Sequence, residues 1–136
     1  TVSAILLMYT GASVMQTFAI TASTFFFFSL YGLTTKKDLT SIGGIAIMAL
    51  IGTILASIVN IFLKSSGLMW VITFVGIGVF VVLVAYDTQK LKAMHARGFE
   101  NEDAEKKIAV MGALMLYLDF INLFILLLRI FGKRRS

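Results

Sequence analysis

The chain has 136 residues, 59% of them hydrophobic and 14% charged, and its mean hydropathy is +0.94. Soluble domains carry about 25% charged residues, so this composition argues against a soluble domain and indicates a protein of the lipid bilayer. The net charge of +5 does not indicate a nucleic-acid-binding protein, because the basic residues are scattered along an apolar chain. We attribute this charge to contact with anionic lipid headgroups.

Long uncharged stretches predict four complete membrane-spanning helices after a partial one. A hydrocarbon core of about 30 Å is crossed by about 20 helical residues, and each uncharged stretch after the first holds one span. The first stretch, residues 1–35, is too long for one span and too short for two, so we divide it near Gly11. The predicted spans are 1–9 (partial), 12–33, 41–63, 68–89 and 107–131.

These spans predict an all-α membrane protein with a single transmembrane domain over residues 1–136. Thr1 begins within hydrophobic sequence, without an initiator methionine or a basic flank. We therefore expect a domain truncated at its N-terminus, the C-terminal part of a longer membrane protein. A short natural protein is the alternative.

Basic residues in the connections predict the orientation in the membrane. The positive-inside rule places residues 34–40 and 90–106 in the cytoplasm and residues 64–67 outside. The last span would then leave three basic residues at 133–135 outside, against the rule. Either the two internal connections dominate, which we favour, or the last helix does not cross fully.

Two aspartates lie where a charge is costly. Asp87 follows an uncharged stretch at 65–86, and Asp119 interrupts another at 108–128. An aspartate at the centre of a membrane helix costs about 2.5–3.5 kcal/mol. Such residues usually face a bundle interior or a water-filled path and mark a function. We predict a functional site at these two residues; the alternatives are an interfacial Asp87 in contact with water and a protonated Asp119 that only bonds another helix.

Three polar residues are candidates to support the aspartates. Asn122 lies one helical turn after Asp119 on the same face, Tyr117 lies on an adjoining face, and Gln89 follows Asp87 at the end of its span. The last two spans can lie antiparallel, and Asp87 can then meet Asp119 if its helix continues past Gln89 while the last span dips toward the cytoplasm.

Such a meeting predicts a proton-controlled cation gate. Two carboxylates in a medium of low dielectric constant cannot both ionise cheaply, so Asp87 and Asp119 would share a proton and titrate as a pair. A singly protonated pair holds two helices together by a hydrogen bond. A doubly ionised pair repels itself and offers oxygen ligands to a hard cation such as calcium.

We do not expect enzymatic activity or a cofactor other than calcium as a permeant or bound ion. The chain contains no cysteine for a thiolate metal site, and His95 is its only histidine. An intramembrane aspartyl protease also uses two aspartates on helices, but its Gly-x-Gly-Asp context is absent around Asp87 and Asp119.

Two motifs resemble the transmembrane Bax-inhibitor-motif family: YDTQKL at residues 86–91 and YLDFINLF at residues 117–124. The segment YGLTTKKDL at residues 31–39 resembles a loop of that family, particularly in its bacterial inner-membrane members. The resemblance extends over essentially the whole chain and implies a location in a bacterial inner membrane.

This resemblance implies a seven-helix fold in which the other six helices surround the last. Members are described as pH-sensitive calcium leak channels with a di-aspartyl sensor, and Asp87 and Asp119 match its two positions. The early helices, with an arginine thought to engage the aspartates, would precede Thr1. The family also implies an alternative function, because some bacterial relatives bind a membrane-anchored AAA protease and modulate its activity, a contact expected at the N-terminal tail.

Overall fold

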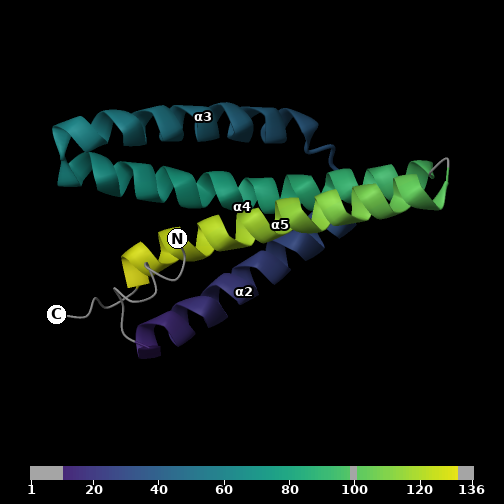
Figure 1. The fold of residues 1–136 in the computed structure, drawn as a ribbon, viewed down its shortest axis with the longest axis horizontal. Coiled ribbons are helices and arrows are strands. Elements are labelled where there is room, and N and C mark those ends of the chain that lie inside the picture. The colour runs from purple at the N-terminus through teal and green to yellow at the C-terminus, as the bar shows by residue number, and fades with distance from the viewer. Residues whose placement is uncertain (1–10, 99–100, 132–136) are drawn as a thin grey trace.

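The computed structural model describes residues 11–98 and 101–131, and these residues form four long helices (Figure 1). All four are long and apolar enough to cross a membrane, and the described part of the chain contains no strand. The predicted all-α fold is thus confirmed, and four helices lie at the positions of the four predicted complete spans, while the partial span at 1–9 lies outside the described residues. The helices are α2 (Gly11–Thr34), α3 (Thr40–Leu63), α4 (Ser66–Arg97) and α5 (Glu102–Phe131).

Helix α4 is the centre of the arrangement. It packs against α2, α3 and α5, whereas α3 packs mainly on α4. Helix α2 also packs against α5, and Figure 1 shows α2 and α3 on opposite sides of α4. Successive helices run in opposite directions, so the last two spans are antiparallel neighbours, an arrangement that the sequence permits.

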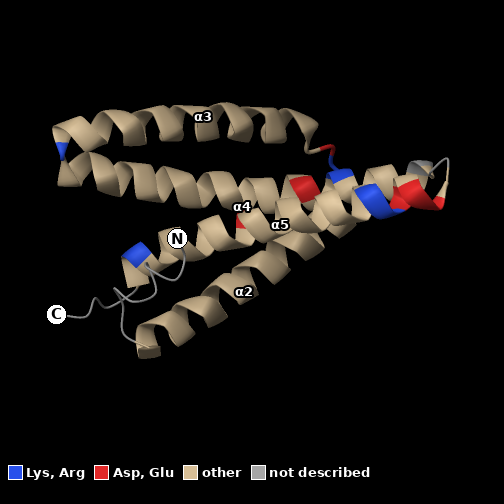
Figure 2. Cartoon of the chain, in the orientation of Figure 1, with Lys and Arg blue, Asp and Glu red and all other residues tan. Residues whose placement is uncertain are grey.

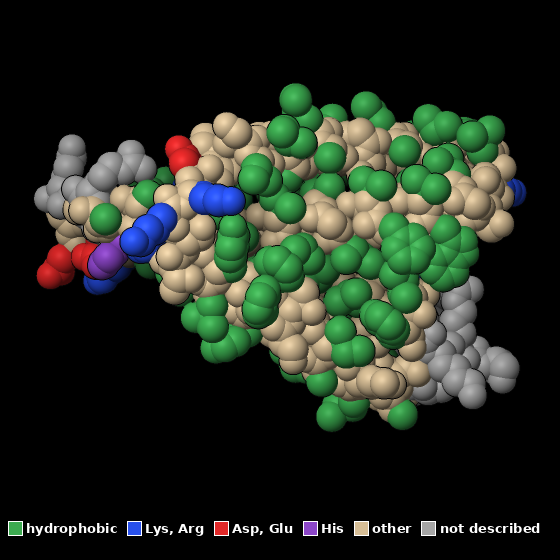
Figure 3. Space-filling model, turned by 180° about the vertical axis from the view of Figure 1, so that it is seen from behind, with side chains coloured by type: hydrophobic (Ala, Val, Ile, Leu, Met, Phe, Trp, Pro, Cys, Tyr) green, Lys and Arg blue, Asp and Glu red, His purple; other side chains and the backbone are tan. Residues whose placement is uncertain are grey.

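Charged residues gather at one end of this bundle, on the α4–α5 hairpin and the α2–α3 connection (residues 35–39), as Figure 2 shows. Seen from behind, the helices between the two ends present mainly hydrophobic side chains (Figure 3). The α2–α3 connection and the α4–α5 hairpin therefore lie at the same end of the bundle, which is consistent with the prediction that both face one side of the membrane.

The prediction of a long connection at residues 90–106 is wrong. Helix α4 continues through Arg97 and ends at Gly98, whose φ of 82° a glycine adopts without strain, and α5 begins at Glu102. Three acidic residues in the first turn of α5 favour its start there, and the Asn101 side chain accepts a hydrogen bond from the Ala104 amide at 2.8 Å. At 32 residues α4 is about 48 Å long, so it exceeds the hydrocarbon core.

The α3–α4 turn at the opposite end is held by side-chain caps. Lys64 adopts a left-handed conformation with φ of 52°, and the Asn60 side chain accepts a hydrogen bond from the Ser65 amide at 3.0 Å. Ser65 in turn accepts one from the Leu68 amide at 3.2 Å and begins α4.

Two glycines let helices approach α4 closely. A Cβ atom at Gly32 of α2 would overlap with the Ala85 carbonyl group, and one at Gly43 of α3 would overlap with the Tyr86 ring. Small residues of this kind allow membrane helices to pack backbone to backbone. Both contacts lie beside the segment that carries Asp87.

Candidate functional site

Four successive residues of α4, Tyr86 to Gln89, contact four different parts of the molecule. With 3.6 residues per turn, four consecutive side chains point around almost the whole helix. A helix at the centre of a bundle can therefore contact every neighbour within one turn, and this turn of α4 does so.

Tyr86 and Thr88 contact the helices on either side. The Tyr86 ring packs on Gly43 of α3. The Thr88 hydroxyl lies 2.7 Å from the carbonyl oxygen of Val84 and 3.1 Å from the Ser29 hydroxyl of α2. Because the Thr88 hydroxyl donates its hydrogen to Val84, Ser29 is the donor to Thr88.

Asp87 faces α5 and interacts with Asp119. Asp87 is 8% exposed and Asp119 6% exposed, so both carboxyl groups are buried, and Asp87 does not lie in bulk water. Asp87 acts on Asp119 through a side-chain hydrogen bond and through its charge. Helix α4 continues past Gln89, as this contact requires.

The contact has a chemical consequence. A hydrogen bond between two carboxyl groups requires a proton on one of them, so the geometry fits a pair that carries a single proton. The Oδ2 atom of Asp119 is buried without a hydrogen-bond partner among the residues that the structure describes. A buried acceptor in this condition is costly, and such atoms in native structures call for an explanation.

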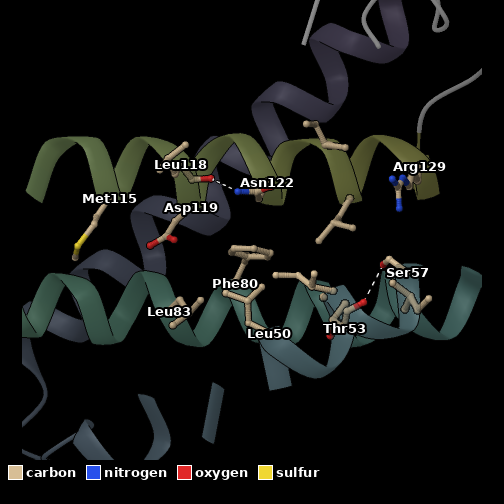
Figure 4. A pocket seen from close by; sticks show the side chains of 15 residues that line it. Leu50, Thr53, Ser57, Phe80, Leu83, Met115, Leu118, Asp119, Asn122 and Arg129 are labelled. Carbon is tan, nitrogen blue, oxygen red and sulfur yellow. Dashed lines mark hydrogen bonds between the residues drawn. The ribbon is translucent and has the colours of Figure 1, made fainter. Parts of the chain in front are cut away.

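A groove of about 460 Å³ runs between α3, α4 and α5 and includes Asp119. Asp119 points from α5 toward α4 in Figure 4, and Arg129 lies further along α5. Most of the lining is apolar, with contributions from Leu50, Phe80 and Leu83. Its polar lining residues are Thr53 and Ser57 of α3 and Asp119, Asn122 and Arg129 of α5.

The three candidate supporting residues have different positions. Asn122 lines the groove beside Asp119, and its side-chain amide donates to the Leu118 carbonyl at 2.8 Å. Tyr117 is 60% exposed and is not part of the groove lining. Gln89 bonds the backbone of the α2–α3 connection at Lys37 and Leu39.

Sequence reasoning missed the other polar residues of the groove. Thr53 and Ser57 are four residues apart, and Arg129 follows Asn122 by two turns, so each spacing indicates a shared helical face. This signal shows which residues share a face but not that α3 and α5 face each other across α4.

The described residues do not form a complete metal site. Within residues 11–98 and 101–131 no group of three or more His, Cys, Asp or Glu side chains could hold a metal ion. Calcium takes six to eight oxygen ligands. Asp87 and Asp119 could therefore bind it only together with water or carbonyl oxygens, which suits transient contact better than tight binding.

Comparisons with known proteins support a relationship over the whole chain. Residues 1–136 match a family model, Bax1-I, described as "Inhibitor of apoptosis-promoting Bax1". Inner membrane protein YbhL of Escherichia coli (strain K12) is 55% identical over 137 residues, which cover 99% of this chain and 58% of that protein. An uncharacterized protein of Rickettsia prowazekii is 50% identical over 130 residues, 96% of this chain and 55% of that protein. The chain thus spans less than two thirds of these relatives.

Proposed function

This chain belongs to the Bax inhibitor family of membrane proteins, and from that premise we propose that the full-length protein is a pH-sensitive leak channel for calcium or another cation. The gate is the pair Asp87 and Asp119. We place the channel in a bacterial inner membrane, the location in the name of its E. coli relative.

One observation carries this proposal: two buried carboxyl groups interact between apolar helices. If one aspartate served only to hold two helices together, a neutral hydrogen-bonding partner would be sufficient. Two acidic groups in contact instead make the helix contact depend on a proton, because only one of them can ionise cheaply.

The direction of the pH effect follows from the protonation states. At low pH the pair holds a proton, and its hydrogen bond keeps α4 against α5 in the closed state. As the pH rises the last proton leaves, and the two charges repel. Two unit charges about 4 Å apart interact by about 4 kcal/mol at an effective dielectric constant of 20, whereas an interhelical hydrogen bond in a membrane contributes about 0.6 kcal/mol. Ionisation therefore outweighs the bond, and cation leak increases with pH.

The groove offers a route beyond the gate. Asn122, Thr53 and Ser57 present polar atoms along it, and the hydroxyl hydrogens of Thr53 and Ser57 are donated to backbone carbonyls of their own helix. Their oxygen lone pairs are then available to a hydrated cation. Ionised Asp119 would attract that cation at the gate.

Calcium flux through the full-length protein in liposomes tests the proposal. We expect a slow leak at about pH 5 that increases toward about pH 8, and none in protein-free liposomes. Flux no greater than in protein-free liposomes across this range would refute the channel. Absent flux together with co-purification of a membrane-anchored AAA protease would favour the protease-partner alternative.

A further inference from the structure

The side-chain amide of Gln89 holds the α2–α3 connection by both of its ends. Its Oε1 atom accepts a hydrogen bond from the Leu39 amide at 2.9 Å, and its Nε2 atom donates to the Lys37 carbonyl oxygen at 2.7 Å. Leu39 itself is only 4% exposed. A single side chain thus satisfies a donor and an acceptor of the connection and fixes its position on α4.

Neighbouring residues of α4 extend this attachment. The Lys92 ammonium group donates to the Leu33 carbonyl oxygen, and Thr88 contacts Ser29. Lys92 lies one helical turn after both Thr88 and Gln89, so the three residues occupy an arc of about 100° on α4. Asp87, two positions before Gln89, points about 200° away, toward α5.

We propose that Gln89 is a positioning residue, which couples the α2–α3 connection to the contact between Asp87 and Asp119. This inference rests on the function proposed above and assigns its regulation. Asp87 and Gln89 belong to the same helical turn, so a rotation or shift of α4 that separates Asp87 from Asp119 also moves Gln89. The connection must then follow α4 or lose both hydrogen bonds.

The coupling is reciprocal. If the state of the aspartate pair changes the position of the connection, a force on the connection changes the pH at which the pair opens, by thermodynamic linkage. The connection carries Lys36, Lys37 and Asp38 with exposed side chains. It can therefore transmit a contact made on the charged side of the membrane to a gate buried between helices.

Among the residues that the structure describes, few other charged groups lie near the pair. Helices α2 and α3 contain no Asp, Glu, Lys, Arg or His, and Asp87 is the charged group that acts on Asp119. Tyr86 is the titratable residue next to Asp87 on α4. The other charged or titratable residues in the described part of the chain are Tyr31, Lys36, Lys37, Asp38, Lys64, Lys90, Lys92, His95, Arg97, Glu102, Asp103, Glu105, Lys106, Lys107, Tyr117 and Arg129. Of these, Arg129 lines the same groove as Asp119.

Gln89→Leu in the full-length protein tests the coupling, with Asn60→Leu as the matched control. Both substitutions remove an amide that bonds the backbone at an end of α3, but Asn60 holds the α3–α4 turn at the far end. The Gln89 bonds occur in the state with the pair in contact, so their loss favours opening. We expect Gln89→Leu to lower the pH of half-maximal calcium leak by about half a unit, and Asn60→Leu to leave it unchanged.

A second variant and a second readout keep the test decisive. Gln89→Asn retains the amide but is one methylene too short for both bonds, so it should shift the leak in the same direction if Gln89→Leu does not fold. A fluorescent probe attached to the cysteine of Lys36→Cys should show a pH-dependent change in fluorescence, which we call the fluorescence step. Asp87→Asn and the Gln89 variants should abolish this fluorescence step, and Asn60→Leu should preserve it.

The outcomes separate this inference from the channel. A pH-dependent leak with the same midpoint in wild type and the Gln89 variants overturns the coupling and leaves the channel intact. If wild-type protein passes no calcium, the channel proposal is wrong, and the fluorescence of the probe alone tests the coupling. A fluorescence step that requires both Asp87 and Gln89 then supports the coupling. A fluorescence step independent of either residue, or no fluorescence step, overturns it.

Discussion

Helices α3 and α4 are adjacent in the chain and similarly apolar, yet they occupy opposite positions in the fold. Helix α3 buries only Gly43 and Ala46, both near its start, and most of its large hydrophobic side chains are exposed. Helix α4 contacts all three other helices and buries residues along its length, including Ile72, Val84 and Asp87.

The difference shows that hydrophobicity places a helix in the membrane but does not place it in the bundle. Lipid tails are as apolar as leucine side chains, so a hydrophobic face gains little by leaving lipid for protein. Close backbone approach and interhelical hydrogen bonds decide the contacts instead. Helix α4 receives both at Ala85–Gln89, whereas α3 contributes mainly two small residues.

The largest expected effect concerns the acid pair of α4. Asp87→Asn and Asp119→Asn in the full-length protein should each flatten the pH dependence of calcium leak, because an asparagine amide does not ionise in this range. Calcium flux in liposomes from about pH 5 to about pH 8 measures this. If both single variants keep the wild-type profile, the two aspartates are structural and α4 is central only in packing.

Asp38→Asn, just before α3, is the matched control. The Thr40 side-chain hydroxyl and backbone amide donate to Asp38 at 2.6 and 3.0 Å, and these hydrogen bonds lower the pKa of its carboxyl below the usual value. Because its pKa is lowered, the Asp38 carboxyl is already ionised at every pH above the usual aspartate pKa. It takes up a proton only when the pH falls below that usual value. It does not change charge between about pH 5 and about pH 8, so Asp38→Asn should keep the pH response.

A substitution in the close contact of α4 should have the next largest effect. Gly32→Leu would push a side chain into the Ala85 backbone, which cannot move as a flexible side chain can. We expect a loss of about 3 kcal/mol in the free energy of unfolding, the upper end for overpacking. Thermal or denaturant unfolding in detergent measures this loss.

Gly44→Leu on α3 is the control for Gly32→Leu. No heavy atom lies within 4 Å of a Cβ atom placed at Gly44. Leucine also has the higher helix propensity, so stability should be unchanged or slightly raised. A loss of stability comparable to that of Gly32→Leu would show that another part of the full-length protein covers this face of α3.

Truncations of leucine and isoleucine side chains should give the smallest of these differences. Leu83 of α4 is 5% exposed and packs in a cluster with Ala46 and Val79, whereas Ile61 of α3 is 68% exposed. We expect Leu83→Ala to lower the free energy of unfolding by about 2 kcal/mol and Ile61→Ala to change it by less than about 0.5 kcal/mol. Equal losses in an unfolding assay would contradict the contrast between the two helices.

The sequence predicted the first two complete spans closely and the last two less well. The spans predicted at 12–33 and 41–63 correspond to α2 and α3, and their ends differ by at most one residue. The span predicted at 68–89 ends eight residues before α4 does, because charges after Gln89 indicate an exit from the bilayer but not the end of a helix. Lysine, leucine, alanine and methionine are good helix formers, so α4 continues in water.

The candidate site was likewise predicted only in part from the sequence. The cost of Asp87 and Asp119 in apolar stretches could be calculated from the sequence, and an antiparallel pair of helices made their meeting possible. The positions of Tyr117 and Gln89 could not be predicted, because one faces away from the groove and the other bonds a connection about fifty residues earlier in the chain. Residues near an aspartate in sequence need not share its partners.

The sequence by itself determined the membrane class, the four complete helices, the shared side of the two charged connections and the two aspartates as the costly residues. Spacing along a helix also shows which side chains share a face. Only the tertiary structure decided which neighbour each face meets: that Asp87 meets Asp119, that Gln89 holds the α2–α3 connection, and that Thr53 joins Asp119 in one groove. The reason is physical: several apolar helices have no hydrophobic preference among one another in lipid, so their order and rotation depend on close packing and polar contacts between segments far apart in the chain.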